Sequence, residues 1–288
     1  MERGHLWLVA TPLGNLGDFS ERARAVLSSA DCILAEDTRR TLQLLRLAGL
    51  QHSQVISFHD HNEEDKLSQV FSLLQEGKTV ALVSDAGTPL IADPGYRLVR
   101  ACRKMGFPVS IVPGPSAPLA ALAISGIPPI PFTFLGFLPR SESDLRKLFA
   151  PYASLVTTLV FFERADRLRT SLGLASEILG PREVAVCREL TKTHEEVLSL
   201  SLSAIGELPL LLGEITVVIG PPVTRERTER AKVIAALADA LAKGAPARQI
   251  VKEVRESVVG WGSKELYALL ETQKRGPLGG SGYGEEKR

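Results

Sequence analysis

The sequence predicts an α/β protein in which two sheet-containing domains precede a small helical domain. Three observations predict this class. Short apolar runs alternate with segments of helical spacing, glycines stand where several helical segments end, and the pattern becomes purely helical after the Pro221-Pro222 pair. With 288 residues, 44% of them hydrophobic, the chain is long enough for two domains with sizeable cores.

The first predicted domain, residues 1–130, contains five short apolar runs, as expected for a mostly parallel sheet covered by helices. These strands are expected at Leu6–Ala10, Cys32–Ala35, Val55–Phe58, Thr79–Val83 and Val109–Val112. The helices between them are expected at Ser20–Ser29, Thr38–Ala48, Glu63–Glu76 and Tyr96–Lys104, and glycines follow the last three.

The second predicted domain, residues 136–222, repeats the α/β pattern after a predicted linker at Gly136–Arg140. Its strands are expected at Thr157–Phe162, Val184–Cys187, Val197–Leu200 and Ile215–Ile219, and its clearest helix at Ala165–Leu179. Residues 224–275 predict a small helical, helix-turn-helix-like domain with helices at Glu229–Ala242, Ala247–Ser257 and Ser263–Thr272. The Gly-rich stretch 276–288 is expected to be a disordered tail.

Charge is distributed unevenly along the chain. The net charge of +1 gives no overall signal for a polyanionic partner. Residues 1–223 carry 21 basic and 24 acidic side chains, whereas residues 224–288 carry 13 and 9. The basic excess at the end of the chain makes the predicted helical domain the place to look for a contact with nucleic acid.

Cysteine usage and hydropathy point to a soluble cytoplasmic protein. Cys32, Cys102 and Cys187 are far apart and odd in number, which favours reduced thiols over a disulfide framework or a thiolate metal site. The amino terminus lacks the pattern of a signal peptide. The most apolar stretch, Ala117–Leu138, is interrupted by four prolines, so no membrane span is expected.

Three loops rich in glycine and proline follow predicted strands of the first domain. They are Thr11–Asp18, Ser84–Pro89 with its continuation Asp93–Gly95, and Pro113–Ala117. A single such loop is more often an ordinary tight turn, but three at one sheet edge favour a ligand site. Because both the dinucleotide and the P-loop glycine motifs are missing and the loops hold few basic residues, we expect a small cofactor without a triphosphate.

These loops resemble those of the tetrapyrrole methylase family, together with Ala35–Arg39, Gly136–Pro139 and Arg188–Lys192. Over residues 5–272 the motifs resemble the branch of that family that methylates small-subunit (16S) ribosomal RNA. The resemblance implies a two-domain α/β fold with S-adenosylmethionine in the cleft between the domains. It also implies methylation of a cytidine 2'-hydroxyl in the decoding region, on ribosomal RNA or the assembled small subunit, by a homodimer.

The resemblance also implies which residues contact the cofactor. On matching positions they are Leu13, Asp85, Thr88, Ser116 and Ala117 and, less securely, Phe162 and Glu163. A sulfonium cofactor carries an ammonium, a carboxylate and an adenine, so one carboxylate, backbone amides and apolar walls suffice to bind it.

Two pairs of residues are candidates for the chemistry on the ribose. Transfer to a neutral hydroxyl requires a group that orients it and takes its proton. Glu36 with Arg39, beside Asp37, and Glu189 with Lys192 are the candidate catalytic residues, and a desolvated Lys192 with a lowered pKa is one plausible base. The alternative for each pair is an ion pair between residues three apart on a helix.

Two further segments allow a functional and a structural interpretation. His59 and His61 have an H-x-H spacing, but the spacing is loose and no thiolate is near, so no metal site is predicted. Arg248, Lys252, Arg255 and Lys264 flank a turn with Trp261, and they predict RNA contacts through phosphates and a stacked base. The alternative is a solvated helical face over a buried Trp261.

Two other functions remain open at this point. One is a methyltransferase of the same fold that acts on a tetrapyrrole, which would not require the basic third domain or the Glu189–Lys192 segment. The other is an RNA-binding protein without catalytic activity, which would not require three preformed loops.

Overall fold

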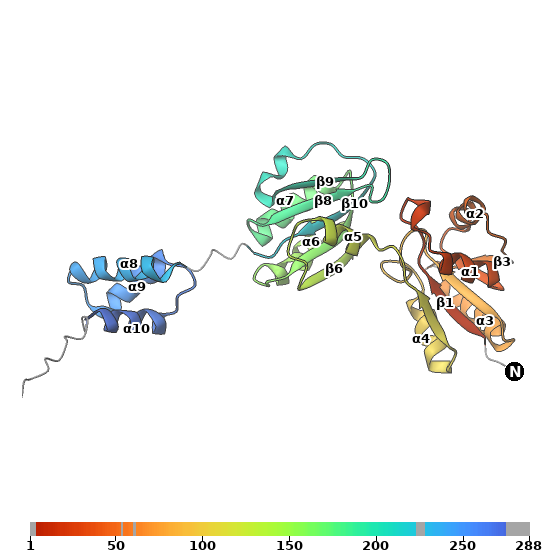
Figure 1. Ribbon diagram of the computed structural model, residues 1–288, viewed down its shortest axis with the longest axis horizontal. Helices are drawn as coiled ribbons and strands as arrows, with labels where there is room; N and C mark the ends of the chain where they lie inside the picture. Colours follow the sequence, from red (N-terminus) through yellow and green to blue (C-terminus); the bar gives the residue numbers. More distant parts are fainter. Residues whose placement is uncertain (1–3, 53, 60–61, 223–227, 275–288) are drawn as a thin grey trace, which may run out of the picture. The chain divides into compact units, whose positions relative to one another are not determined.

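The computed structural model describes residues 4–52, 54–59, 62–222 and 228–274 (Figure 1). Its contacts divide the chain into two compact units, Met1–Pro222 and Val223–Arg288. Among these described residues, the first unit holds two five-stranded sheets, and the second holds three helices. The predicted tail, the first residues of the predicted helical domain (224–227) and His61 of the H-x-H pair lie outside the described residues.

The first sheet is parallel throughout, as predicted. Its strands follow the order β3-β2-β4-β1-β5, where the bounds are β1 His5–Val9, β2 Cys32–Ala35, β3 Gln54–Ser57, β4 Thr79–Val83 and β5 Val109–Val112. Helices α1 (Glu21–Ser29) and α2 (Thr38–Leu47) pack on one face of this sheet. Helices α3 (Glu63–Gln75) and α4 (Tyr96–Met105) pack on the other. The central strands β2 and β4 are therefore buried on both faces, which explains why they are almost wholly apolar, whereas the edge strands β3 and β5 include the polar residues Gln54, Ser57 and Ser110.

Polar side chains accept hydrogen bonds from backbone amides in the first turns of several helices that cover the first sheet. The hydroxyl of Ser20 accepts a hydrogen bond from the Ala23 amide, and the carboxylate of Asp37 accepts one from the Arg39 amide. The carboxylate of Glu63, which is buried, accepts a hydrogen bond from the Leu98 amide in the first turn of α4. These contacts fix the helix starts, and through them the loops at the carboxyl edge of the sheet.

The second sheet is mostly antiparallel, so the prediction of a mostly parallel pattern is wrong for this part of the chain. The strand order is β6-β7-β10-β8-β9, with bounds β6 Phe132–Phe137, β7 Thr158–Arg164, β8 Glu183–Arg188, β9 Glu196–Ser201 and β10 Glu214–Ile219. Only the β6–β7 pairing is parallel. The reason is visible at residues 189–195, since so short a connection joins β8 to β9 only as an antiparallel pair.

The segment around Gly136 also differs from the prediction. Gly136 and Phe137 are the last residues of β6 and not the start of a linker. Helices α5 (Ala117–Ile124) and α6 (Glu142–Phe149) lie in stretches where no helix is predicted. In α5 the proline at position 118 falls in the first turn, where a missing backbone N–H costs nothing.

Helix α7 (Leu168–Leu179) packs with α6 on one face of the second sheet, and α5 packs on the other. The described part of the first unit also contains the short 3₁₀ helices η1 (Leu16–Asp18), η2 (Ala150–Tyr152) and η3 (Leu202–Glu207). Arg182 is 1% exposed, and its guanidinium donates to the backbone carbonyls of Leu179, Gly220, Tyr152 and Ala153. Burial lowers the pKa of Arg182. Through its hydrogen bonds this residue is a structural clamp that joins a helix end, a strand end and η2.

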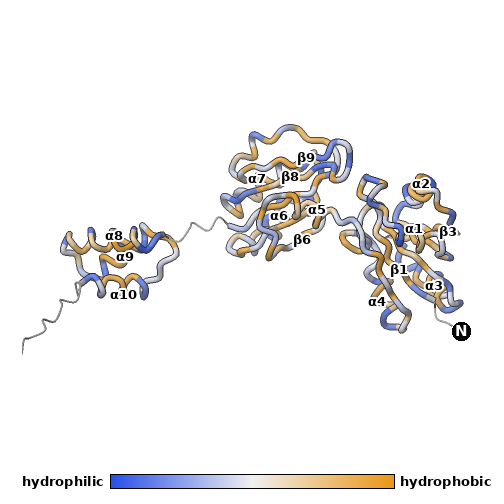
Figure 2. The backbone as a smooth tube through the Cα atoms, in the orientation of Figure 1, coloured by the Kyte–Doolittle hydropathy of each residue, from blue (hydrophilic) through white to orange (hydrophobic). Residues whose placement is uncertain are grey.

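The second unit is a bundle of α8 (Arg230–Ala242), α9 (Ala247–Ser257) and α10 (Ser263–Lys274). Each helix shows both hydrophobic and hydrophilic stretches in Figure 2. The apolar side chains, among them Val233, Leu237, Ile250 and Leu266, form one buried cluster. Trp261 packs against this cluster and its indole N–H donates to the carbonyl of Thr228.

All three cysteines are free and buried, as predicted for reduced thiols. Burial raises the pKa of each thiol, Cys32, Cys102 and Cys187, to about 11. No helix in the described part of the chain is both long and apolar enough to cross a bilayer.

Candidate active site

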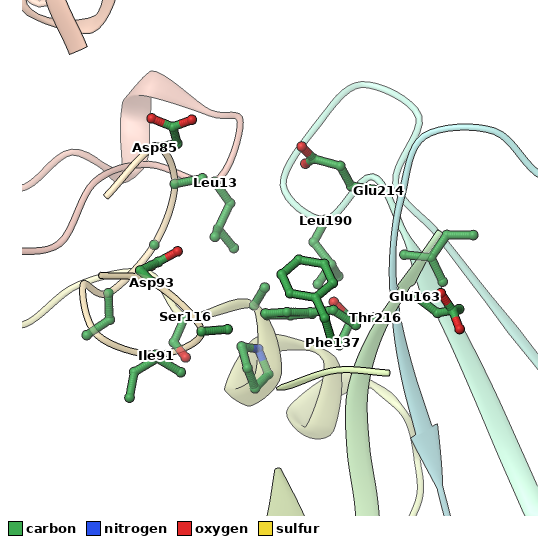
Figure 3. A pocket seen from close by; sticks show the side chains of 18 of the residues that line it. Leu13, Asp85, Ile91, Asp93, Ser116, Phe137, Glu163, Leu190, Glu214 and Thr216 are labelled. Carbon is green, nitrogen blue, oxygen red and sulfur yellow. The ribbon is translucent and has the colours of Figure 1, made fainter. Parts of the chain in front are cut away.

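A cavity of about 360 Å³ lies where the loops of the first sheet meet those of the second (Figure 3). The first sheet contributes the loops after β1, β2, β4 and β5, which all leave its carboxyl edge. The second contributes the ends of β6 and β7, the loop after β8 and the start of β10. All seven residues expected to contact a cofactor line this cavity: Leu13, Asp85, Thr88, Ser116, Ala117, Phe162 and Glu163.

Hydrogen bonds from the backbone and from one side chain hold the three glycine- and proline-rich loops together. Thr11 and Gly87 exchange two bonds, at 2.9 and 3.0 Å, between the first and second loops. The Thr88 hydroxyl donates to the carbonyl of Pro115, at 3.0 Å, and so joins the second loop to the third. The cavity wall is therefore formed by the protein itself, which lowers the ordering cost of binding.

The loop after β4 holds unusual backbone conformations. Gly87 has a φ of +89°, and a Cβ there would lie 3.2 Å from a methyl group of Leu13. Leu90 and Ala92 have φ values of 73° and 69°, which L-residues rarely adopt. Among the described non-glycine residues, the other two with positive φ are Glu189 and Thr191, also beside the cavity. Such backbone strain concentrates at functional sites.

Asp85 connects the β4 loop to the loop after β2. One oxygen of its carboxylate accepts a hydrogen bond from the Asp37 amide at 3.0 Å, and the other lies 3.3 Å from a guanidinium nitrogen of Arg40. Glu36 lines the cavity from the loop after β2, and Arg40 lines it from the first turn of α2. The negative charge of Asp85 is thus held at the rim, where it is accessible to a cationic group.

The structure brings Arg40 to the cavity, and not the predicted Arg39. The Arg39 guanidinium donates two hydrogen bonds to Asp37, and its side chain is 89% exposed. These bonds lower the pKa of Asp37 to about 2. On α2 the side chains of Arg39 and Arg40 project in different directions, so that Arg39 bonds to Asp37 and Arg40 lines the cavity.

Glu163 is 4% exposed, and its carboxylate is surrounded by donors from its own sheet and α7. It accepts hydrogen bonds from the Ser171 hydroxyl at 2.5 Å and the Arg164 amide at 2.9 Å, and lies 3.5 Å from the Arg167 guanidinium. The neighbouring Phe162 contributes an aromatic ring to the cavity wall. Glu163 is therefore a buried, internally bonded carboxylate at the base of that wall.

Lys192 forms an ion-paired cluster with two carboxylates next to the cavity. Its ammonium donates to Glu189 at 3.1 Å and to Glu214 at 2.9 Å, and Glu189 also accepts a bond from the Glu214 amide. Glu214 and Leu190 line the cavity, whereas Glu189 and Lys192 lie behind them. The Lys192 stem lies against the loop after β1, since a Cβ on Gly14 would fall 2.3 Å from its Cγ.

The prediction that Lys192 has a lowered pKa is wrong. Burial alone would lower the pKa of Lys192, but the hydrogen bonds and attraction from Glu214 and Glu189 outweigh it, so that its pKa is raised. The pKa of Glu189 is lowered, mainly because its carboxylate accepts a hydrogen bond from the Glu214 amide. The hydrogen bond and the positive charge of Lys192 lower it further. At neutral pH the cluster holds an ammonium and carboxylates, which agrees with the alternative of an ion pair.

Several cavity residues are absent from the sequence-based prediction: Arg40, Ile91, Asp93, Phe137, Leu190, Glu214 and Thr216. Asp93 could have been chosen from its position in the second loop. Phe137 gave no usable signal, because its segment was interpreted as a linker.

In the helical unit, the four basic residues predicted to contact RNA are exposed. Arg248, Lys252 and Arg255 lie on one stripe of α9, and Lys264 stands in the first turn of α10. Trp261 is only half exposed and its ring packs on the bundle core, which favours the alternative of a buried tryptophan over a base-stacking one.

Comparisons with known proteins agree with this architecture. The sequence model of the tetrapyrrole (corrin/porphyrin) methylases matches residues 5–206. The crystal structure of the methyltransferase CobJ superimposes with a TM-score of 0.60 at 19% identity, covering 78% of this chain and 97% of that one, which shows the shared fold. The α/β fold class predicted from the sequence is confirmed.

Two relatives are closer in sequence, and both are named ribosomal RNA small subunit methyltransferase I. The protein of Mycobacterium tuberculosis (strain CDC 1551 / Oshkosh) is 42% identical over 279 residues, which cover 95% of this chain and 97% of the relative. The protein of Thermotoga maritima is 46% identical over 219 residues, which cover 75% of this chain and 98% of the relative. The chain therefore belongs to the tetrapyrrole (corrin/porphyrin) methylases and, within them, to the ribosomal RNA small subunit methyltransferase I family.

Proposed function

We propose that this chain transfers a methyl group from S-adenosylmethionine to the ribose 2'-hydroxyl of a cytidine in the decoding region of small-subunit ribosomal RNA. The observation that carries the proposal is the 42% identity, over 95% of the chain, with a relative whose name states methyl transfer to that RNA. The choice of the 2'-hydroxyl of a cytidine follows from the resemblance of the loop motifs.

The residues of the cavity fit S-adenosylmethionine. Among the described residues, five carboxylate side chains (Glu36, Asp85, Asp93, Glu163 and Glu214) and two guanidiniums (Arg40 and Arg164) line it. Two of the carboxylates, Glu163 and Glu214, also pair with Arg167 and Lys192. The carboxylates of this wall suit the cationic groups of S-adenosylmethionine. Leu13, Ile91 and Phe162 supply apolar surface for the uncharged parts. In this proposal Asp85 attracts the ammonium group, while Thr88, Ser116 and Ala117 surround the rest.

When bound, the cofactor supplies the methyl group in an activated, cationic form. The side chains of this chain have to orient the ribose hydroxyl and take its proton. We propose that Glu36, a cavity-lining carboxylate, takes the proton of the ribose hydroxyl. The cluster of Glu189, Lys192 and Glu214 orients that hydroxyl. Lys192, with its raised pKa, acts as a fixed cation and not as a base.

We propose that the helical unit holds the RNA backbone. Arg248, Lys252 and Arg255 stand at i, i+4 and i+7 on α9, and none of them forms an ion pair with another described residue. The variant Arg248→Ala/Lys252→Ala/Arg255→Ala should reduce the slope of log affinity for RNA against log salt concentration by about 2. Each lost phosphate contact lowers this slope by about 0.7 to 0.9. Lys232→Ala is the control, because Lys232 pairs with Glu229. An unchanged slope would exclude this face.

We propose in addition that the protein is a homodimer. Ile130, Phe132, Leu155 and Val156 are exposed and apolar, and they adjoin because the Thr158 amide donates to the Pro131 carbonyl. β6 is also an edge strand of its sheet. Light scattering should report a dimer, and Ile130→Asp should yield a monomer.

Methyl transfer from a labelled cofactor to RNA tests the proposed activity. Small-subunit RNA and assembled subunits, both from a strain that lacks this protein, are incubated with the purified chain, and mass spectrometry maps the product. We expect one cytidine to gain a 2'-O-methyl group. Transfer to a tetrapyrrole acceptor with none to either RNA substrate would overturn the proposal.

A further inference from the structure

The strand that borders the cavity, β6, contains a bulge. Phe134 pairs with Val160 of the neighbouring β7, but the next registered pair is Phe137 with Phe162. Two residues of β6, Leu135 and Gly136, therefore oppose a single residue of β7. Gly136 has a φ of +69°, a conformation that glycine adopts without strain.

The bulge changes the face to which Phe137 points. With regular alternation, Phe137 would share the face of Leu135, which packs into the core beneath α6 and α7. With the extra residue, Phe137 lies on the face of Phe134 instead. The rings confirm this, because both Phe134 and Phe137 have their centroids 5.1 Å from that of Phe162. β-Bulges near functional sites re-aim side chains in this way.

Phe137 is held from one side and open on the other. Its ring contacts Phe162 at an interplanar angle of 53°, and Phe134 supports Phe162 edge-on at 72°. Phe137 nevertheless remains 65% exposed and lines the cavity, where Figure 3 shows it among the other lining side chains. An aromatic ring turned away from an available core and toward water loses burial energy, which indicates a ring kept for a ligand.

We propose that Phe137 is the stacking platform for the nucleobase of the nucleotide that is methylated. This inference rests on the proposed function. A ribose whose 2'-hydroxyl enters the cavity brings its base to the mouth, and an unstacked base needs an aromatic face to replace its lost neighbours. Because stacking uses the π-face of the base, it supplies affinity, and the identity of the base is left to polar groups.

Charges on the same cavity suit a nucleotide. The guanidiniums of Arg40 and Arg164 line it with largely exposed side chains, paired only with Asp85 and with Asp166 among the described ion pairs. The Arg164–Asp166 pair is exposed on both sides, and exposed pairs are weak and exchange readily for a phosphate. The mouth thus combines an open aromatic ring with two arginines, the combination that single-stranded RNA sites use.

The test compares Phe137→Ala, Phe137→Leu and Phe137→Trp with the parent chain. Tyr96→Ala is the matched control, because Tyr96 is an aromatic residue of nearly equal exposure, 64%, that does not line the cavity. The probe is a short single-stranded RNA of the target sequence with the fluorescent analogue pyrrolocytidine at the methylated position. Fluorescence reports stacking without any turnover, and steady-state transfer to unlabelled RNA gives KM and kcat.

For Phe137→Ala we expect the KM for RNA to rise about tenfold, the ratio that 1.4 kcal/mol of base stacking produces. Phe137→Leu, which keeps apolar volume but no π-face, should behave like the alanine variant. Phe137→Trp should match the parent. Quenching of pyrrolocytidine should be lost in the first two variants and kept in the third, while the affinity for S-adenosylmethionine stays unchanged in all of them.

Three results would overturn the inference. Equal KM and quenching in Phe137→Ala and the parent would mean that the ring does not meet the base. Weaker cofactor binding would place the ring against the cofactor. A change of mass in light scattering would make Phe137 a protein contact. If the parent chain methylates no RNA, the proposed function is wrong. The quenching of pyrrolocytidine still decides independently whether Phe137 stacks on a base.

Discussion

The two sheets of the first unit build their shares of the cavity in different ways. In the parallel first sheet, every strand that contributes ends at the same edge, and the loops that follow hold the contacts. In the mostly antiparallel second sheet, the regular end of β7 contributes together with a bulge in β6, a strained loop after β8 and the start of β10. The part of the site on the parallel sheet thus follows from strand order, whereas the part on the antiparallel sheet also depends on local irregularities of the backbone.

The largest expected effect concerns the stability of the second sheet. Arg182→Ala removes the donor for four backbone carbonyls and leaves buried acceptors unpaired, so we expect a loss of about 3 kcal/mol in the free energy of unfolding. Urea unfolding measures this loss. Arg146→Ala, which breaks only exposed ion pairs, should cost less than about 1 kcal/mol. Equal losses for the two variants would contradict the clamp.

The next effect concerns the first sheet. Asp85→Ala removes the carboxylate proposed to attract the cofactor, and we expect the affinity for S-adenosylmethionine to fall about 30-fold, equivalent to roughly 2 kcal/mol. Asp85→Asn, which still accepts a hydrogen bond from the Asp37 amide, should separate loss of charge from loss of loop structure. Calorimetry is the measurement, with Glu142→Ala as an exposed carboxylate control. Similar affinities for Asp85→Ala and Glu142→Ala would place the site elsewhere.

Lys192→Ala should lower kcat about tenfold, as expected for one charged hydrogen-bonding group, and leave cofactor affinity unchanged. The depressed pKa of Glu189 gives stability that is lost only as the pH falls below its usual 4.5. The raised pKa of Lys192 gives stability that is lost only as the pH rises above its usual 10.5. The parent and Lys192→Ala should therefore show pH–rate profiles of the same shape between about pH 6 and 9. A titration in that range that Lys192→Ala abolishes would restore Lys192 as the base.

The smallest effect tests the strained loop of the second sheet. Gly213 has a φ of +95°, and a Cβ there would fall 2.4 Å from the carboxylate of Glu189. Gly213→Ala should therefore cost about 1 kcal/mol of stability and displace Glu189, with a fall in kcat. Gly206→Ala, where a Cβ meets nothing within 4 Å, should change neither quantity. A Gly213→Ala variant with parental stability and kcat would show that Glu189 need not stay in place.

The sequence predicted the first sheet and its loops well because buried parallel strands are almost wholly apolar and their ends mark the site. All five strands of that sheet lie within one residue of their predicted bounds. The prediction from the sequence failed where the identity of a single residue at the cavity depends on the detailed geometry of a helix turn. Arg39 and Arg40 are adjacent and chemically identical, but on α2 their side chains project in different directions, so that Arg39 bonds to Asp37 and Arg40 lines the cavity.

The second sheet shows the same limit. The strand series resembles that of the first sheet, and only the short chain between β8 and β9 distinguishes an antiparallel pair. A bulge leaves no mark in hydrophobic alternation, so Phe137 could not be assigned to the cavity face before its pairing partner was known.

The three buried thiols make the natural chain a convenient background for chemical labelling. At neutral pH a thiol with a pKa of about 11 is almost entirely protonated, and each of these side chains is also shielded from reagents. A single cysteine introduced at an exposed position, such as Leu210, would then react alone with a maleimide dye. Fluorophores and spin probes can thus be attached site-specifically without first replacing any native cysteine.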